Sequence, residues 1–288
     1  MNRKNLWATS LALFLFLGAA FLPAVNAGAG DVEKRNFVLI FEILDYNNDI
    51  GNAVRYFFQN VIRPGDQLIV YTPAKVYGFS PAKLSRPFRE QAAELQQILK
   101  ADTASAAARY RDIITAMRQI VADGGADAEI SEANLVNYRN QMDNMRQMRQ
   151  INENMIAGIA NVFKGQPGNH HLILFFQAEF RPIPKKETID RMKENPRLGF
   201  HATTLFLQDQ VEKRIDSDII KETLTNAGVP LHLVYFRGRT LRMSTGQQKE
   251  HSLDVWNAFK EVAAATGGRV ESAAAVEAAL KSLQPYLK

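Results

Sequence analysis

The chain is 288 residues long, and its composition is that of an ordinary globular protein: 46% of the residues are hydrophobic and 23% are charged. This balance excludes a disordered chain, a collagen and a disulfide scaffold. There is no cysteine, which excludes zinc ribbons, iron–sulfur centres, a thiol nucleophile and a lipid anchor on an N-terminal cysteine. The 35 Lys and Arg residues stand against 30 Asp and Glu residues, and this excess is too small to indicate a nucleic-acid partner.

The N-terminal segment has the pattern of a secretory signal peptide. A basic start precedes the apolar run Leu6–Leu22, and small residues suited to signal peptidase follow at Val25 and Ala27. We expect residues 1–27 to be removed and residues 28–288 to form one exported domain, in the periplasm or outside the cell. An uncleaved anchor is the alternative, because the apolar run is near the lower length limit for a membrane helix.

Four short apolar runs predict strands that are buried on both faces, because their apolar side chains follow one another without alternation. They are Asn36–Leu44, Gln67–Tyr71, His171–Phe176 and Leu231–Phe236. Weaker signals predict extended segments at Lys75–Phe79 and Thr203–Leu207.

Seven segments with helical spacing or helix-start signals alternate with these strands. They are Ile50–Ile62, Lys83–Val121, Ser131–Phe163, Thr188–Lys193, Ser217–Asn226, Leu253–Thr266 and Ala274–Leu287. The alternation predicts an α/β fold: a mainly parallel sheet with helices on both faces. We expect the two long helical segments to form an extended hairpin, so that residues 83–163 are an expanded helical region within the domain.

Three stretches together resemble the von Willebrand factor A-like family, in particular its secreted bacterial branch. They are NFVLIFEILDYNND with its following helix and RPGDQLIVYTPA, then GQPGNHHLILFF, and finally AGVPLHLVYFRG with the later FKEVAAATGGRVESAAAVEAAL. The resemblance covers most of residues 36–287 except Lys83–Phe163, and its most specific part is Ala264–Arg269. It implies a doubly wound, Rossmann-like sheet whose ligand site lies at the carboxyl ends of the strands.

The resemblance also implies a divalent-metal site, and the sequence departs from it. The family's Asp-x-Ser-x-Ser motif aligns with residues 42–46, where Glu42 keeps a carboxylate but Leu44 and Tyr46 replace both hydroxyl ligands. The family's threonine ligand has no counterpart, because no Ser or Thr lies between positions 131 and 188. We therefore expect a degenerate metal-dependent adhesion site and no resident cofactor.

The fourth-strand aspartate of the family falls on Gln177 or Glu179. One use of this edge is an all-carboxylate cluster of Glu42, Asp45 and Glu179 that holds Mg²⁺ or Ca²⁺ together with waters. The other is that Asp45 caps the loop or the following helix while Glu42 and Glu179 pair with nearby Arg or Lys.

No catalytic motif stands out, and we expect no enzyme activity. The sequence has no nucleophile elbow, no P-loop and no G-x-G-x-x-G fingerprint. None of the five histidines belongs to a zinc-protease motif. The adjacent His170 and His171 are expected to point to opposite faces of a strand.

The strand-end edge instead offers candidate contacts for a partner protein: Tyr46, Asn47, Gln177, Arg237, Arg239 and Arg242. The arginine loop follows a buried strand, and guanidinium groups there could bind a carboxylate or phosphate on the partner. A solvated basic loop is the alternative. The sequence predicts an exported module that acts by protein–protein contact, with a partner in the cell envelope and no membrane span after processing. The alternative function is a divalent-cation-dependent adhesion module.

Overall fold

A six-stranded sheet forms the centre of the protein in a computed structural model that describes residues 34–123, 130–151, 153–207, 215–238 and 246–288. In spatial order the strands are β3 (Val76–Phe79), β2 (Gln67–Tyr71), β1 (Arg35–Glu42), β4 (Asn169–Ala178), β6 (Leu231–Arg237) and β8 (Val270–Ala273). Every neighbouring pair is parallel except β2 and β3. Counted along the chain, this is the doubly wound order 3-2-1-4-5-6, which confirms the predicted fold class.

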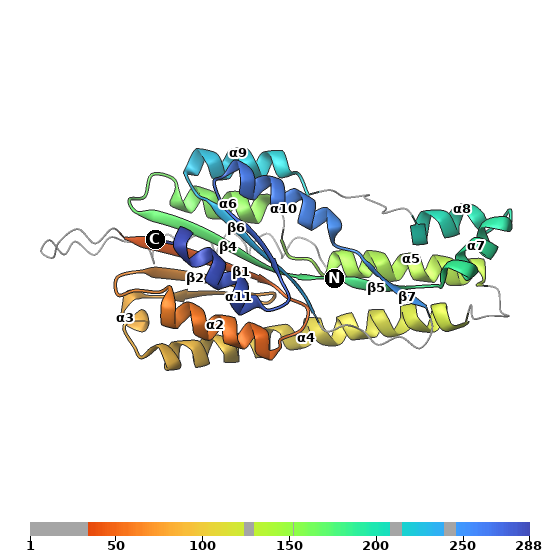
Figure 1. Ribbon diagram of the computed structural model, residues 1–288, viewed down its shortest axis with the longest axis horizontal. Coiled ribbons are helices and arrows are strands. Elements are labelled where there is room, and N and C mark those ends of the chain that lie inside the picture. The colour runs from red at the N-terminus through yellow and green to blue at the C-terminus, as the bar shows by residue number, and fades with distance from the viewer. Residues whose placement is uncertain (1–33, 124–129, 152, 208–214, 239–245) are drawn as a thin grey trace, which may run out of the picture.

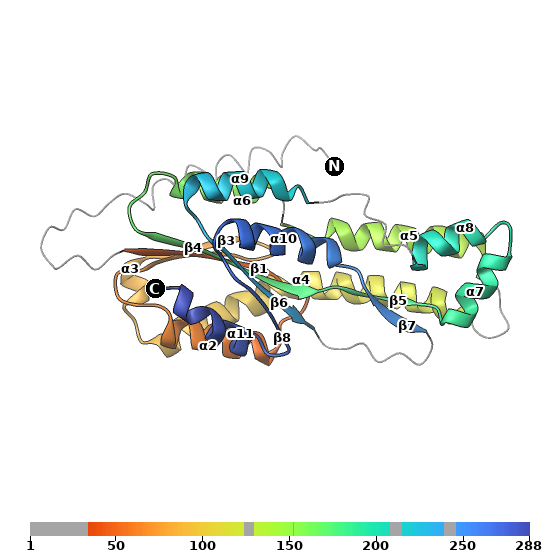
Figure 2. The ribbon, with the colours of Figure 1, turned by 45° about the horizontal axis from the view of Figure 1, so that its top comes forward.

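The strands are apolar throughout because both faces of the sheet are covered. In β1, Phe37, Leu39 and Phe41 point into one core, while Val38 and Ile40 point into the other. The first core is closed by α2 (Asn48–Asn60), the first half of α4 (Phe88–Asp123) and α11 (Val276–Leu283), together with the short α3 (Pro81–Leu84). The second core is closed by α6 (Glu153–Phe163), α9 (Ser217–Ala227) and α10 (Leu253–Ala265). Figures 1 and 2 show these two helix layers on either side of the sheet.

An arm extends beyond one end of the sheet (Figure 1). The arm (residues 110–123, 130–147, 180–207 and 247–250) contains the second half of α4 and the helices α5 (Glu132–Gln147), α7 (Lys186–Glu194) and α8 (Gly199–Ala202). It also contains the antiparallel pair β5 (Phe180–Ile183) and β7 (Gln247–Glu250). Its buried residues, among them Met117, Tyr138 and Phe206, form a third core that is separate from the sheet.

The helical region expected over residues 83–163 is divided between body and arm. The first half of α4 packs on α2 over the sheet, its second half forms the arm with α5, and α6 leaves the hairpin to pack against α9. Ser131 caps the N-terminus of α5: its hydroxyl oxygen accepts a hydrogen bond from the backbone N–H of Asn134 at 3.2 Å. The prediction of an extended segment at Thr203–Leu207 is wrong. It is a π-helical turn, and Leu205 and Phe206 both turn into the core of the arm instead of alternating across a sheet.

Two predictions fall outside the described residues: the signal peptide at residues 1–27, and the contacts expected from Arg239 and Arg242. Within the described ranges, no helix combines the length and the apolarity that crossing a bilayer requires.

Candidate functional site

The strand order reverses between β1 and β4, and the crevice beyond the strand ends at such a point is the usual ligand site of open α/β sheets. Here the protein fills this place with its own groups. The side-chain oxygen of Gln177, near the end of β4, accepts hydrogen bonds from the backbone N–H groups of Leu44 and Asp45 at 2.8 and 2.9 Å. A Cβ on Gly238 would lie 2.2 Å from the Gln177 amide nitrogen, so the chain leaving β6 passes directly over this side chain. Gln177 is 5% exposed and lies out of a partner's reach.

An ion network around Arg149 covers the same edge from the connection between α5 and α6. The Arg149 guanidinium binds both carboxylate oxygens of Glu179, at 2.9 and 2.8 Å, and one oxygen of Asp254 at 2.6 Å. It also donates to the backbone oxygen of His251 at 2.9 Å. Burial opposes the charge on Arg149, but the two carboxylates outweigh burial and raise the pKa of the guanidinium. Glu179 therefore pairs with an arginine, as the second of the two expectations for this edge has it.

Glu42 ends β1 beside this network and is half-buried. Its carboxylate accepts a hydrogen bond from the backbone N–H of Gln150 at 2.7 Å. Desolvation raises the pKa of Glu42 from 4.5 to about 7; the negative charge of Glu179 adds to the rise, and the backbone donors of Gln150 and Ile151 limit it. Glu42 therefore changes its charge near neutral pH.

The residues at this edge do not fit the divalent cation that the family resemblance implies. Among the described residues, no group of three or more His, Asp or Glu side chains is placed to hold a metal ion. Both oxygens of Glu179 are taken by Arg149. Asp45 is not the cap of α2 either: the side-chain oxygen of Asn47 fills that position and accepts from the backbone N–H of Ile50 at 3.0 Å.

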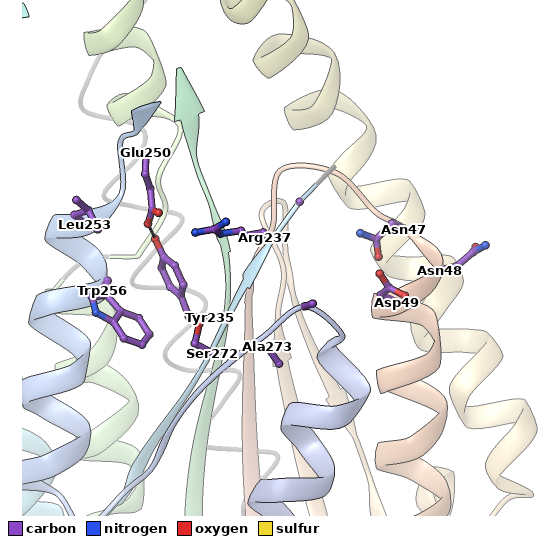
Figure 3. A pocket seen from close by; sticks show the side chains of 12 residues that line it. Asn47, Asn48, Asp49, Tyr235, Arg237, Glu250, Leu253, Trp256, Ser272 and Ala273 are labelled. Atoms are coloured by element: carbon purple, nitrogen blue, oxygen red, sulfur yellow. Dashed lines mark hydrogen bonds between the residues drawn. The ribbon is translucent and has the colours of Figure 1, made fainter. Parts of the chain in front are cut away.

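An open cleft of about 820 Å³ lies on the other side of Gly238, between the carboxyl ends of β6 and β8 and the helices α2 and α10 (Figure 3). Three groups of residues line it, from the start of α2, from the strand ends, and from β7 and the start of α10. They are Asn47, Asn48 and Asp49; Tyr235, Arg237, Gly238, Ser272, Ala273 and Ala274; and Glu250, Leu253 and Trp256.

One wall of the cleft is aromatic and held in place by hydrogen bonds. The Tyr235 hydroxyl donates to the Glu250 carboxylate and lies 2.8 Å from the Ser252 hydroxyl oxygen. The Trp256 ring meets the Tyr235 ring edge-on, with the ring centres 4.9 Å apart. Desolvation and the bond to Glu250 raise the pKa of Tyr235, so its hydroxyl stays a neutral donor. The wall therefore presents to the cleft an indole that packs against a tyrosine held by hydrogen bonds.

Arg237 lies between this wall and the start of α2 (Figure 3). It is exposed, and its guanidinium packs over the Phe180 ring at 5.9 Å. No carboxylate within the described ranges forms an ion pair with it. On the opposite wall, Asp49 and Asn48 are exposed in the first turn of α2. The cleft thus combines an exposed arginine, an aromatic surface that carries the Glu250 carboxylate, and a separate polar wall that carries Asp49.

The structure brings two of the candidate partner-binding residues, Asn47 and Arg237, to the same cleft. Tyr46 lies elsewhere: it packs against the first core, on the face of the sheet that α2 covers, and the ammonium group of Lys100 lies 5.8 Å from its ring. Its hydroxyl fills the space beside Gly51.

Sequence reasoning missed the aromatic wall and the β8 side of the cleft. Trp256 stands in the first turn of a helix that the sequence predicts, but nothing in the spacing shows which strands that helix faces. Ser272 and Ala273 were missed because β8 has the sequence VESA, which has no apolar run. A tryptophan in a helix start that follows a buried strand is the one signal that could have been used.

Comparison with known proteins places the chain in no family: no family model and no curated protein matches it. Among solved structures it is similar to the human COPII-coat protein Sec24c, with 11% identity and a TM-score of 0.38 over 88% of this chain and 32% of that one. It is also similar to the N-terminal domain of TFIIH p34, with 10% identity and a TM-score of 0.31 over 90% of this chain and 98% of that one. The chain thus spans about a third of the Sec24c chain. Likeness this distant carries no functional argument, and the fold class rests on the strand order itself.

Proposed function

We propose that this chain is an exported, non-enzymatic protein-binding module of von Willebrand A type, and that the strand-end cleft takes a segment of a partner protein. The observation that carries the proposal is the exposed Arg237, which forms no ion pair with the residues that the structure describes, beside the Trp256 wall in an open cleft. Arginine and tryptophan are the side chains most enriched among the residues that dominate binding energy at protein interfaces.

The partner segment carries a carboxylate next to an apolar or aromatic side chain. A guanidinium binds a carboxylate through two parallel N–H···O bonds, which fix the orientation of the partner as well as its charge. The apolar neighbour packs against Trp256 and against Leu253, which is 40% exposed. Arg237 supplies the positive charge for this contact, so binding needs no divalent cation.

A sequence feature supports export, and the strand order supports the family relationship. The N-terminal 27 residues have the order of a signal peptide, from a basic start through an apolar run to small residues. The strand order with an antiparallel β3 at the edge agrees with the doubly wound sheet that the resemblance implies. The partner is then a protein of the cell envelope, and the mature chain begins at Gly28. Mass spectrometry of the protein recovered from its source cells checks this N-terminus.

The binding proposal is tested by comparative affinity capture from the envelope fraction of the source cells. The baits are the mature wild type, Arg237→Glu, Trp256→Ala and the control Lys164→Glu, each with and without chelator. Lys164 is an exposed lysine between the end of α6 and the start of β4, so it lies toward the amino ends of the strands, whereas the cleft lies at their carboxyl ends. Lys164→Glu therefore changes the net charge as Arg237→Glu does, but away from the cleft.

We expect one set of proteins to be captured by the wild type and by Lys164→Glu, with or without chelator, and to be lost from both cleft variants. Equal capture by all four baits would contradict a partner in the cleft. Capture that disappears in chelator would favour the cation-dependent adhesion module instead.

A further inference from the structure

We infer that Arg149 is a built-in cation: its guanidinium supplies the positive charge that a divalent metal would supply at the strand ends, offsets part of the carboxylate charge there and fixes one wall of the cleft. The inference rests on the geometry around Arg149 and does not depend on what the cleft binds.

The contacts of Arg149 resemble a coordination shell more than a surface ion pair. Its side chain is 11% exposed, and the side chains of Glu179 and Asp254 are 3% and 15% exposed. Four hydrogen bonds of 2.6–2.9 Å join it to these two carboxylates and to the His251 carbonyl. A planar guanidinium suits this arrangement, because it binds one carboxylate with two donors and keeps others for further acceptors.

The carboxylates need a cation at this place. Glu179 and Asp254 interact electrostatically with each other, and Glu42 interacts with Glu179 and with Arg149. Glu179 and Asp254 are poorly hydrated, so they repel each other unless a positive charge lies between them, and the charge of Glu179 also disfavours ionisation of Glu42. Arg149 binds Glu179 and Asp254, and the backbone N–H of the next residue, Gln150, donates a hydrogen bond to Glu42.

Arg149 also fixes the wall of the cleft. Asp254 lies in the first turn of α10, which carries Leu253 and Trp256 into the cleft. The backbone N–H of Glu179 donates to the Ser252 hydroxyl at 3.0 Å, and that hydroxyl meets the hydroxyl of Tyr235. One side chain from the α5–α6 connection therefore fastens the loop after β4 and the start of α10 to each other.

The family resemblance implies a metal at this edge, and the residues present do not fit one. The built-in cation accounts for that disagreement. A strand-end site that carries its own positive charge offsets part of the carboxylate charge, as a metal would, and does not depend on metal concentration.

The test is thermal unfolding of the wild type, Arg149→Ala and Arg149→Gln, each in chelator and in millimolar Mg²⁺ or Ca²⁺. Mg²⁺ is commonly held by one or two carboxylates and several waters, and removal of the guanidinium leaves Glu179 and Asp254 as such a pair. We expect both variants to melt several degrees below the wild type in chelator and to recover part of the loss with either cation. The melting temperature of the wild type should not respond.

The double variant Arg149→Ala/Asp254→Asn is the matched control, and it should lose the recovery because one of the two carboxylates is gone. If Arg149→Ala does not fold in chelator, its refolding yield with and without Mg²⁺ gives the same answer. Variants that melt equally in chelator and in cation would overturn the inference, as would a wild type that is stabilised as strongly as they are. No partner is present in this experiment, so its failure is distinct from failure of the binding proposal.

Discussion

Among single residues, Glu42 has the clearest consequence for solution behaviour. Its pKa is raised from 4.5 to about 7 in the folded chain, chiefly by desolvation. The folded state therefore holds a proton that the unfolded state has released between these two values. The stability contributed by the protonated form is fully present below pH 4.5 and is lost as the pH rises through about 7.

Glu42→Gln should remove this part of the pH dependence, because the neutral amide oxygen still accepts the hydrogen bond of Gln150. We expect the variant to be more stable than the wild type at about pH 8, by roughly 2 kcal/mol, and to approach the wild type near pH 5. Urea unfolding at both pH values measures the difference. Glu222→Gln, on the exposed face of α9, is the control, and an equal effect there would show that the position of Glu42 is irrelevant.

The buried histidines act in the opposite direction. His170 stacks on Phe163 and His171 on Phe37, on opposite faces of the sheet as predicted. Within the part of the chain that the structure describes, His171 and His232 have no hydrogen-bond partner for either ring nitrogen, and desolvation lowers their pKa values from 6.5 to about 4 and about 3. Both stay neutral in the folded chain, so their contribution to stability is present above pH 6.5 and is lost as the pH falls through these values.

His232→Leu should therefore make the protein more resistant to acid. At neutral pH we expect a change within about 1 kcal/mol, because no hydrogen bond is removed. At about pH 4 the variant should be more stable than the wild type by roughly 2–3 kcal/mol. Acid titration followed by circular dichroism measures the shift, and an unchanged acid midpoint would show that His232 is not the group that titrates.

At the scale of elements, the Thr-Gly-Gly-Arg sequence before β8 marks a close contact between backbones. A Cβ on Gly268 would lie 1.7 Å from the backbone oxygen of Leu231, at the start of β6. β6 is held between β4 and β8 and cannot move away. This contact is the physical reason for a glycine in the stretch that carries the most specific part of the family resemblance.

Gly268→Ala should destabilise the fold by more than about 3 kcal/mol or prevent folding, since the clash is with backbone in a central strand. Gly78→Ala is the control, because a Cβ there meets nothing within 4 Å. Denaturant unfolding of the two variants compares them. If the Gly268→Ala protein is as stable as the Gly78→Ala protein, the close contact between Gly268 and the backbone of Leu231 in β6 is contradicted.

The sequence predicted the elements whose own side chains determine them and missed those determined by their neighbours. β1, β2, β4 and β6 are marked by unbroken apolar runs. β7 and β8 have the sequences QQKE and VESA and become strands only because β5 and β6 offer free edges. The sequence does not show the break between α5 and α6, because the apolar residues Met148 and Ile151 keep a helical spacing across it. Both side chains are at least partly buried, but the backbone between them leaves the helix, and the N–H of Gln150 donates to Glu42.

The candidate site follows the same division. Asn47 and Arg237 could be placed at one edge from the sequence, because each follows a buried strand and parallel strands end at the same edge. The cleft itself could not, since it requires β8 beside β6 and α10 turned so that Trp256 faces Tyr235. The role of Arg149 could not be predicted for a different reason. Its partners Glu179 and Asp254 lie 30 and 105 residues away in the sequence.

The whole molecule consists of a doubly wound body and an arm. α4 runs through both, and the α5–α6 connection lies where the arm meets the strand ends. Arg149 and Gln150 occupy the crevice at the strand reversal, and the cleft that stays open lies beside it, between β6, β8 and α10. The exposed Phe200 lies in the arm, and the exposed Ile219 lies on α9. Large apolar side chains therefore meet solvent at the cleft, in the arm and on α9, and we assign binding to the cleft.

Site-specific photo-crosslinking in the source cells tests that assignment most directly. A benzophenone side chain replaces Leu253 in the cleft, Phe200 in the arm or Ile219 on α9, which are 40%, 75% and 49% exposed. Binding in the cleft predicts a crosslinked partner from position 253, unchanged by chelator and lost when Arg237→Glu is added, and no such product from position 219. The same partner crosslinking at positions 200 or 219 and not at 253 would contradict binding in the strand-end cleft.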